Sequence, residues 1–227
     1  MSEVFIWNFL KKKGLSDWGT AGLMGNLYAE SGLKSTNLQN TYEKKLGLSD
    51  EDYTAQVDSG IYHDFVHDCA GYGLAQWTFW SRKQNLLAFA RNKGTSIGDL
   101  EMQMNFLWKE MTTGYPALVE VLMSATTVQA ASDAVLTQLE RPADQSKRAK
   151  AKRASYGQKY YDQYAGKGET MPSTNIVPAV KRLLETARAE IGYVEKETNA
   201  QLDNKTANAG DNNWNKYARD LDAIGIV

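Results

Sequence analysis

Helical spacing of apolar residues is the feature that most constrains this chain, because it runs through the first 165 residues almost without strand-type alternation. In the segment 4–13, for example, Phe5, Ile6, Phe9 and Leu10 would lie on one face of a helix. Helices of this kind bury their apolar stripes against other helices. The pattern therefore predicts an all-α domain of roughly seven or eight helices over residues 1–165.

Capping residues and glycines indicate where these helices begin and end. Gly14 would end the first helix, and Ser16 or Asp17 would cap a second one that runs to Glu30. Further helical patterns cover residues 81–92, 99–111, 115–124, 127–139 and 147–164. Residues 31–60 are polar and show no sustained periodicity, so we expect a long irregular insert there that would suit one wall of a cleft.

Residues 166–175 have the composition of a linker, rich in Gly, Pro, Ser and Thr. After them, Val180, Leu183, Leu184, Ala187 and Ile191 would share one face of an amphipathic helix. The polar stretch that follows, and a short helix near residue 214, add little apolar surface to bury. Residues 176–227 therefore predict the beginning of a second domain, not a complete one.

Charge and the few cysteine and histidine residues exclude several classes of function. A formal net charge of −1 argues against a dedicated nucleic-acid binder, and no apolar stretch is long enough to span a membrane. The single cysteine, Cys69, leaves no intrachain disulfide and no cysteine-based metal site. His63 and His67 have i,i+4 spacing but no Glu between them in the zincin arrangement, so we expect no metal and no cofactor.

Glu30 is the first candidate for catalysis. It would lie where an apolar helix gives way to a turn at Gly32. Desolvation of a carboxyl group raises its pKa, and a raised pKa suits the general acid that glycosidic cleavage needs near neutral pH. The alternative is an inert, solvated residue at a helix end, since most surface carboxylates have no special role.

Several strings within residues 1–165 resemble those of known proteins. Glu30–Gly32 and Gly73–Gln76 are similar to the Glu-Ser pair and the Gly-Leu-x-Gln segment of the lysozyme-like superfamily. The longer strings are, in order, Asn8–Leu15, Gly25–Gly32, Gly71–Thr78, Arg82–Leu87, Leu139–Pro142 and Arg148–Tyr161. Together and in this order they resemble the phage tail lysozyme family. The resemblance implies a lysozyme-like multi-helix fold that acts on peptidoglycan, with Glu30 as general acid and Ser31, which closes the same helix, as a substrate-binding residue.

The resemblance also implies residues that would bind the sugar. Gln76 would hydrogen-bond an N-acetyl or hydroxyl group, and Tyr72 and Trp77 would offer flat apolar faces to sugar rings. Tyr161, or its neighbour Tyr160, would reach the site from the last helix of the domain. Core packing is the alternative role for Trp77 and for at least one of the two tyrosines.

The partner of Glu30 stays open among several carboxylates. An inverting mechanism needs a second carboxylate about 6.5–9.5 Å away, and a retaining one needs it about 5–5.5 Å away. Asp68 is preferred because the chain leads from it into the Gly71 turn, although it could instead cap a turn or helix. Asp64 precedes the same turn, and the polar insert adds Glu43, Asp50, Glu51, Asp52 and Asp58. Use of the substrate's acetamido group would require none of them.

Two other charged features are expected to be structural. Glu140 precedes Arg141 and Pro142 at a helix end, and we expect a buried or dipole-related ion pair there, not the acid. A basic cluster on the last helix is expected to form a solvated face, with steering toward an anionic wall polymer as the alternative. Its members are Lys147, Arg148, Lys150, Lys152 and Arg153.

Ala189–Glu195 and Asn212–Leu221 resemble the opening of a CHAP amidase/peptidase domain. In that family the nucleophilic cysteine follows soon after such a segment, and the chemistry needs a Cys and a His. Neither residue type occurs here beyond Cys69. The chain therefore resembles the front enzyme of a bifunctional lysin that ends before its second active site.

The predicted function is that of a muramidase-like glycoside hydrolase. An endo-N-acetylglucosaminidase or a lytic transglycosylase is the alternative on the same substrate, and a non-catalytic wall-binding tail module is the alternative from another class. Peptidoglycan is the expected partner, together with a wall-binding subunit or the remainder of a longer lysin. The N-terminus shows no secretory signal. We therefore expect synthesis in the host cytoplasm and action on the wall after holin release or from a virion.

Overall fold

The computed structural model describes residues 2–142, 144–167, 189–212 and 214–223. Contacts divide the chain into two compact units, Met1–Pro172 and Ser173–Val227, and each is described by itself. The predicted linker 166–175 and the amphipathic helix expected from Val180 to Ile191 lie mostly outside the described residues. The predicted domain boundaries therefore stay predictions.

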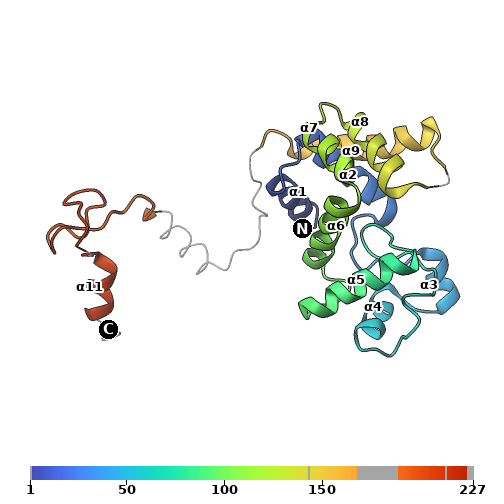
Figure 1. Cartoon of the computed structure of the whole chain (residues 1–227), viewed down its shortest axis with the longest axis horizontal. Helices are drawn as coiled ribbons and strands as arrows, with labels where there is room; N and C mark the ends of the chain where they lie inside the picture. Colours follow the sequence, from blue (N-terminus) through green and yellow to red (C-terminus); the bar gives the residue numbers. More distant parts are fainter. Residues whose placement is uncertain (1, 143, 168–188, 213, 224–227) are drawn as a thin grey trace. The chain divides into compact units, whose positions relative to one another are not determined.

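Helices build the first unit, and the described residues contain isolated bridges but no strand. Figure 1 shows two groups of helices in this unit, with α3, α4 and α5 apart from the others. The first group comprises α1 (Ser2–Lys12), α2 (Asp17–Ser31), α6 (Leu100–Gly114), α7 (Pro116–Ser124), α8 (Val128–Val135) and α9 (Lys147–Tyr164). The second comprises α3 (Asn40–Leu46), α4 (Asp50–Asp58) and α5 (Trp80–Lys93). The prediction of an all-α, lysozyme-like fold is confirmed.

The ends of α2 follow the capping signals in the sequence. The Ser16 side chain accepts a hydrogen bond from the backbone N–H of Gly19 at 2.9 Å, which satisfies one of the free donors of the first turn. At the other end Gly32 adopts the left-handed conformation, with φ of 62°, and its N–H donates to the carbonyl of Tyr28. The helix therefore stops directly after Glu30 and Ser31.

The expected helix 127–139 is divided in two. After α8 the chain forms a π-helical turn, η1 (Leu136–Glu140), in which the N–H of Arg141 donates to the carbonyl of Leu136 at 2.9 Å. Arg141 then takes a left-handed conformation, with φ of 46°, before Pro142. Such π turns are rare and occur frequently at functional sites.

The expectation of an irregular insert over residues 31–60 is wrong. Two short helices, α3 and α4, lie within it. Gly47 ends α3 in the left-handed conformation, and the Ser49 side chain caps α4 by accepting from the N–H of Asp52. Helices this short bury few side chains, so their apolar residues show no sustained period. Packing against the rest of the unit stabilises them instead.

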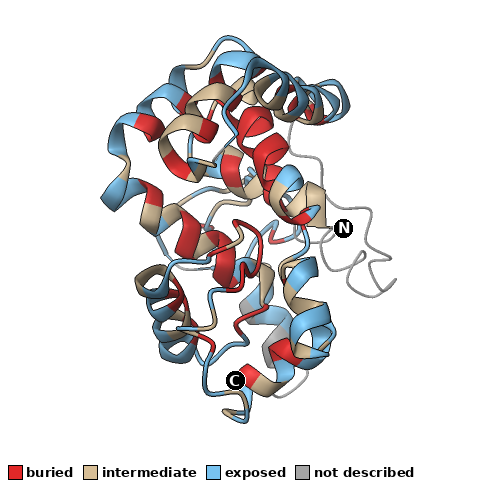
Figure 2. Cartoon of the chain, turned by 90° about the vertical axis from the view of Figure 1, so that its right-hand side faces the viewer, coloured by how far each residue is buried: buried red, intermediate tan, exposed pale blue. Residues whose placement is uncertain are grey.

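The central helix of the unit is α2. Every residue from Gly19 to Leu27 is buried, and the helix packs most extensively against α9 and then α8. Figure 2 shows the contrast with other helices, which bury only one side. The close contact with α9 depends on glycine: a Cβ added to Gly25 would lie 2.5 Å from the carbonyl oxygen of Arg153 and 2.5 Å from the nitrogen of Gly157.

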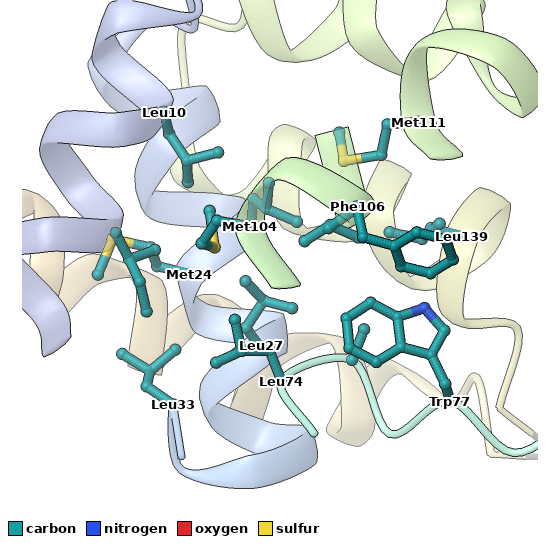
Figure 3. Packing of buried hydrophobic residues seen from close by; sticks show 14 of the residues in the cluster. Leu10, Met24, Leu27, Leu33, Leu74, Trp77, Met104, Phe106, Met111 and Leu139 are labelled. Carbon is teal, nitrogen blue, oxygen red and sulfur yellow. The ribbon is translucent and has the colours of Figure 1, made fainter. Parts of the chain in front are cut away.

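Apolar side chains from separate elements meet in one core around α2. Figure 3 shows Leu27 of α2 beside Leu74, which comes from the turn before α5, and Trp77 beside Phe106 of α6. Leu27, Leu74 and Trp77 are all fully buried. The turn 71–77 is therefore part of the core as well as a loop.

The second unit is described only in part. Its described elements are a loop region and α11 (Lys216–Ala223). Lys196 is fully buried, and its ammonium group donates to the carbonyls of Asn204, Lys205 and Ala207. Across the described residues of both units, no helix has the length and apolar character needed to cross a membrane.

Replacement of Gly25 by Ala is expected to destabilise the protein by about 1–3 kcal/mol, because the new methyl group would meet backbone atoms of α9. Elsewhere in a helix the same change is favourable by up to about 1 kcal/mol. Gly114→Ala is the matched control, since nothing lies within 4 Å of a Cβ there. Urea unfolding measures both; equal stability of the two variants would contradict the close contact.

Candidate active site

Glu30 lies in the last turn of α2, where α9 supplies a partner for it. The Arg153 side chain donates to the Glu30 carboxylate at 2.5 Å, and both side chains are mostly buried, with 14% and 20% exposed. The same guanidinium reaches the backbone and side-chain oxygens of Asn26 at 3.5 Å. Glu30 is thus neither the lone desolvated acid nor the solvated helix end considered from the sequence: it is held in an ion pair.

Ser31 joins the end of α2 to the turn 71–77. Its hydroxyl, buried in the core, donates to the carbonyl of Leu74 at 2.9 Å and also lies 3.1 Å from the carbonyl of Leu27. The N–H of Leu74 in turn donates to Gln103 of α6. The structure therefore brings together the two strings that flank the proposed site, and Ser31 acts as the connection between them.

Gln76 holds the same turn in shape. Its backbone is left-handed, with φ of 44°. Its side-chain amide nitrogen donates to the Asn37 side chain at 2.9 Å and also contacts the carbonyls of Asn37 and Gly73. These bonds engage the donors of the amide within the protein. A contact between Gln76 and a sugar stays a prediction.

The aromatic residues predicted to stack on sugars lie in the core. Tyr72 and Trp77 have no exposed surface. The Tyr72 hydroxyl pairs with Thr54, and the Trp77 indole N–H donates to Glu110 at 3.1 Å. Tyr161 is half-buried and stacks on Trp18, with ring centroids 5.6 Å apart. In this conformation neither Tyr72 nor Trp77 offers a face to a ligand. For Trp77 this agrees with the alternative of core packing, and a sugar contact of Tyr72 stays a prediction.

Asp68 is enclosed by hydrogen-bond donors. Its carboxylate accepts from Lys83 at 2.5 Å, from the hydroxyls of Tyr53 and Tyr62 at 2.5 and 3.2 Å, and from the N–H of Ala70 at 2.9 Å. Only 3% of the Asp68 side chain and none of the Lys83 side chain is exposed. Burial lowers the pKa of Lys83, while its bond to Asp68 acts in the opposite direction. This arrangement is typical of a structural ion pair.

Three of the remaining candidate carboxylates, Asp64, Asp50 and Asp58, are exposed or bonded to backbone. Asp64 lies on the surface, and the insert residue Asp50 accepts from the N–H of Leu38 and pairs with Lys34. Asp58 accepts from the N–H of Ile97. A catalytic role for Asp64 or Asp68 stays a prediction, and the contacts of Asp68 favour a structural one.

Glu140 interacts electrostatically with Glu30, which the sequence did not predict. Its Oε1 atom is buried and has no hydrogen-bond partner. Among the described residues it also makes no ion pair, so the expected ion pair is wrong; the residue is half-buried and only Oε1 is fully enclosed. Burial, and then the Glu30 carboxylate, raise the pKa of Glu140 to about 8, while Arg82 and Arg153 oppose that shift.

Arg82 and Glu110 complete the charged surroundings of Glu140. Arg82 of α5 donates two hydrogen bonds to the Glu110 carboxylate of α6, at 2.7 and 2.8 Å, and so forms a bidentate ion pair. Both groups act on the pKa of Glu140 through space, as do Glu30 and Arg153. Sequence reasoning missed Arg82 and Glu110, and it placed Arg153 among surface charges. The position of Glu140 between an apolar helix and Pro142 was the only available signal.

A pocket of about 400 Å³ opens beside the Glu30–Arg153 pair. It is lined by aromatic residues from two helices, Tyr28 and Tyr156, and by the basic residues Arg148, Lys152 and Arg153. Tyr28 is 40% exposed, and its ring meets that of Tyr156 edge to face. Rings of this kind can contact the C–H faces of sugars, and the cations can contact anionic groups.

The described residues contain no group of three or more His, Cys, Asp or Glu side chains placed to hold a metal ion. Cys69 is exposed, and its thiol contacts the carbonyl of His67 at 3.5 Å. No part of the candidate site therefore depends on the cysteine.

An all-helical unit with a glutamate at a helix end beside a pocket is consistent with a lysozyme-like protein. The family model described as phage tail lysozyme matches residues 3–164. The chain belongs to the phage tail lysozyme family, and at that level it is a lysozyme-like cell-wall hydrolase. The match covers the first unit up to the end of α9. Among curated proteins, none matches the chain.

Asp68→Asn is expected to destabilise the protein by about 3–5 kcal/mol, because it leaves the ammonium group of Lys83 buried without an opposite charge. Asp64→Asn, at an exposed position, should change stability by less than about 0.5 kcal/mol. Urea unfolding at pH 7 gives both values. Lost wall lysis with unchanged stability in Asp68→Asn would instead indicate catalysis.

Proposed function

We propose that this protein is a muramidase-type glycoside hydrolase that cleaves the glycan strand of bacterial peptidoglycan, with Glu30 as general acid. The observation that carries the proposal is the position of Glu30. Ala29, which precedes it, and Arg153, which holds it, both line the 400 Å³ pocket. Glu30 itself is not one of the lining residues, but its carboxyl group is bonded to Arg153 of the pocket wall, and we expect it to act on a glycosidic oxygen of a strand bound there.

The lining of the pocket suits this substrate. The glycan strand presents C–H faces that Tyr28 and Tyr156 can contact, and its peptide stems carry carboxylates that Arg148 and Lys152 can bind. Neither Arg148 nor Lys152 makes an ion pair among the described residues. Part of the basic cluster would therefore contact the wall polymer, which was the alternative to a solvated face.

In the proposed reaction Glu30 donates its proton to the glycosidic oxygen as the bond to the anomeric carbon breaks. Water then attacks the anomeric carbon, or the acetamido group of the substrate attacks it first. The ion pair with Arg153 holds the Glu30 carboxyl in place for this step. Because the acid must carry a proton, the site also needs a source for it.

Residues 176–227 are proposed to begin a CHAP-like domain. The support is limited to the sequence strings Ala189–Glu195 and Asn212–Leu221. We also propose that the protein acts on the wall after holin release or from a virion. A wall-binding subunit or further lysin domains would direct it to the wall.

Glu30→Gln is expected to lower the rate of wall lysis by at least about 100-fold, because the amide cannot donate a proton to the leaving oxygen. Glu120→Gln on α7, at an exposed position, is the matched control and should lyse walls at the wild-type rate. The measurement is loss of turbidity of purified walls, with circular dichroism to confirm the fold. Equal lysis by wild type and Glu30→Gln would exclude Glu30 as the acid.

The bond that is cut can be read from the products of digested peptidoglycan by mass spectrometry. Reducing muramic acid ends indicate the proposed muramidase. Reducing glucosamine ends indicate an endo-N-acetylglucosaminidase, and 1,6-anhydro ends indicate a lytic transglycosylase. A wild-type protein that sediments with walls but releases no product would be a binding module.

A further inference from the structure

Glu140 is the one carboxyl group among the described residues with a buried oxygen, Oε1, that has no hydrogen-bond partner. An ionised carboxylate is costly to bury in that state, whereas a neutral carboxylic acid is far less so. Asp68 shows the contrast within the same unit, since its buried carboxylate is surrounded by donors and paired with Lys83. The environment of Glu140 therefore suits a group that carries a proton.

The charges around Glu140 lead to the same conclusion. Four charged groups act on it, each from a different helix: Glu30 of α2, Arg82 of α5, Glu110 of α6 and Arg153 of α9. The two arginines are already paired, with Glu110 and with Glu30. Glu140 is thus a third carboxyl group beside two cations. One bound proton makes the five groups neutral as a set.

We propose that Glu140 is a positioning residue for the glycosidase reaction: it holds one proton beside the Glu30–Arg153 ion pair and passes it to Glu30 when the glycan strand fills the pocket. The proposal rests on the proposed role of Glu30. Glu140 would be the proton source that this role requires. The Glu30 carboxylate is paired with a cation in the free protein and must gain a proton to act as an acid.

The proton balance closes over one turnover. The O–H bond of Glu140 breaks and an O–H bond forms on Glu30, so the total charge of the five groups does not change. Glu30 then gives this proton to the glycosidic oxygen, which keeps the electron pair of the breaking C–O bond. Water adds its hydroxyl group to the anomeric carbon, and its remaining proton returns to the carboxyl pair.

The backbone around Glu140 is consistent with a specialised position. The residue ends the π-helical turn η1, directly before Arg141 in its left-handed conformation. Conformations of this kind cost free energy and persist where the surrounding structure requires them. An ordinary α-helical continuation of α8 would give the side chain of Glu140 a different direction.

The resident proton can be measured without reference to activity. Protein labelled with ¹³C at the glutamate carboxyl groups is titrated by NMR, and the signal of Glu140 is the one that disappears in Glu140→Gln. We expect this signal to titrate near pH 8, as burial and the Glu30 carboxylate require. A midpoint below about pH 5 would overturn the proposal, because it is close to that of an ordinary glutamate.

The transfer to Glu30 is tested by steady-state kinetics on a soluble glycan oligomer of alternating N-acetylglucosamine and N-acetylmuramic acid. Glu140→Gln is close to the neutral acid in shape but cannot release a proton. We expect kcat to fall by about 100-fold or more with KM within about twofold of wild type. The alkaline limb of the pH profile should move to lower pH by at least about one unit, since Glu30 then takes its proton from solvent.

Glu140→Asp restores a carboxyl group and should recover part of kcat together with the wild-type shape of the pH profile. An unchanged kcat and pH profile in Glu140→Gln would overturn the proposal. So would a uniform loss of activity at every pH, which would indicate a purely structural residue. If Glu140→Gln does not fold, Glu140→Asp replaces it in the kinetic test. The wild-type NMR titration then tests the proton on Glu140, and the Glu140 signal is assigned as the one that disappears in Glu140→Asp.

Failure of this inference is distinguishable from failure of the proposed function. A wild-type protein that cleaves no glycan, or a fully active Glu30→Gln, contradicts the proposed function while the NMR titration still tests the proton on Glu140. An active wild type with an inactive Glu30→Gln and an unaffected Glu140→Gln contradicts this inference alone.

Discussion

The contact between α2 and α9 is the constraint on which the rest of the site depends. It is close because Gly25 and Gly157 have no side chains, so the two backbones meet directly. Arg153 lies one turn before Gly157, and Glu30 lies five residues after Gly25. The crossing therefore puts a cation from one helix beside an anion from the other, and it lets α9 line the pocket next to Glu30.

Asp68 and Glu140 of the first unit each place carboxyl oxygens away from solvent, but their surroundings differ. Asp68 lies among donors and is paired with Lys83, so it links α5 to α4 through Tyr53. Glu140 has no such donors and instead lies among charges that are already paired. A satisfied buried pair rigidifies the fold, whereas burial without donors favours the protonated form of a carboxyl group.

The helices with a long apolar stripe could be predicted from the sequence closely. Ser16 and Gly32 lie at the two ends of α2, and the Ser146 side chain caps the start of α9 by accepting from the N–H of Ala149. These capping interactions are local and need no tertiary information. The short helices α3 and α4 were missed because their stability comes from neighbours that are distant in the chain. The π turn at Glu140 was missed for a related reason, since no residue pattern distinguishes it from an α-helical turn.

The sequence by itself determined that the chain is helical, that Glu30 ends a helix and that the first unit resembles phage tail lysozymes, because periodicity, caps and ordered strings are local properties. Only the tertiary structure decided what surrounds each carboxyl group. Asp68 and Glu140 are both acidic residues near turns, yet one has four donors and the other an oxygen without any. The desolvation and the electrostatic surroundings of a carboxyl group depend on residues from other helices. The residues next to that carboxyl group in the sequence do not predict which ones these are.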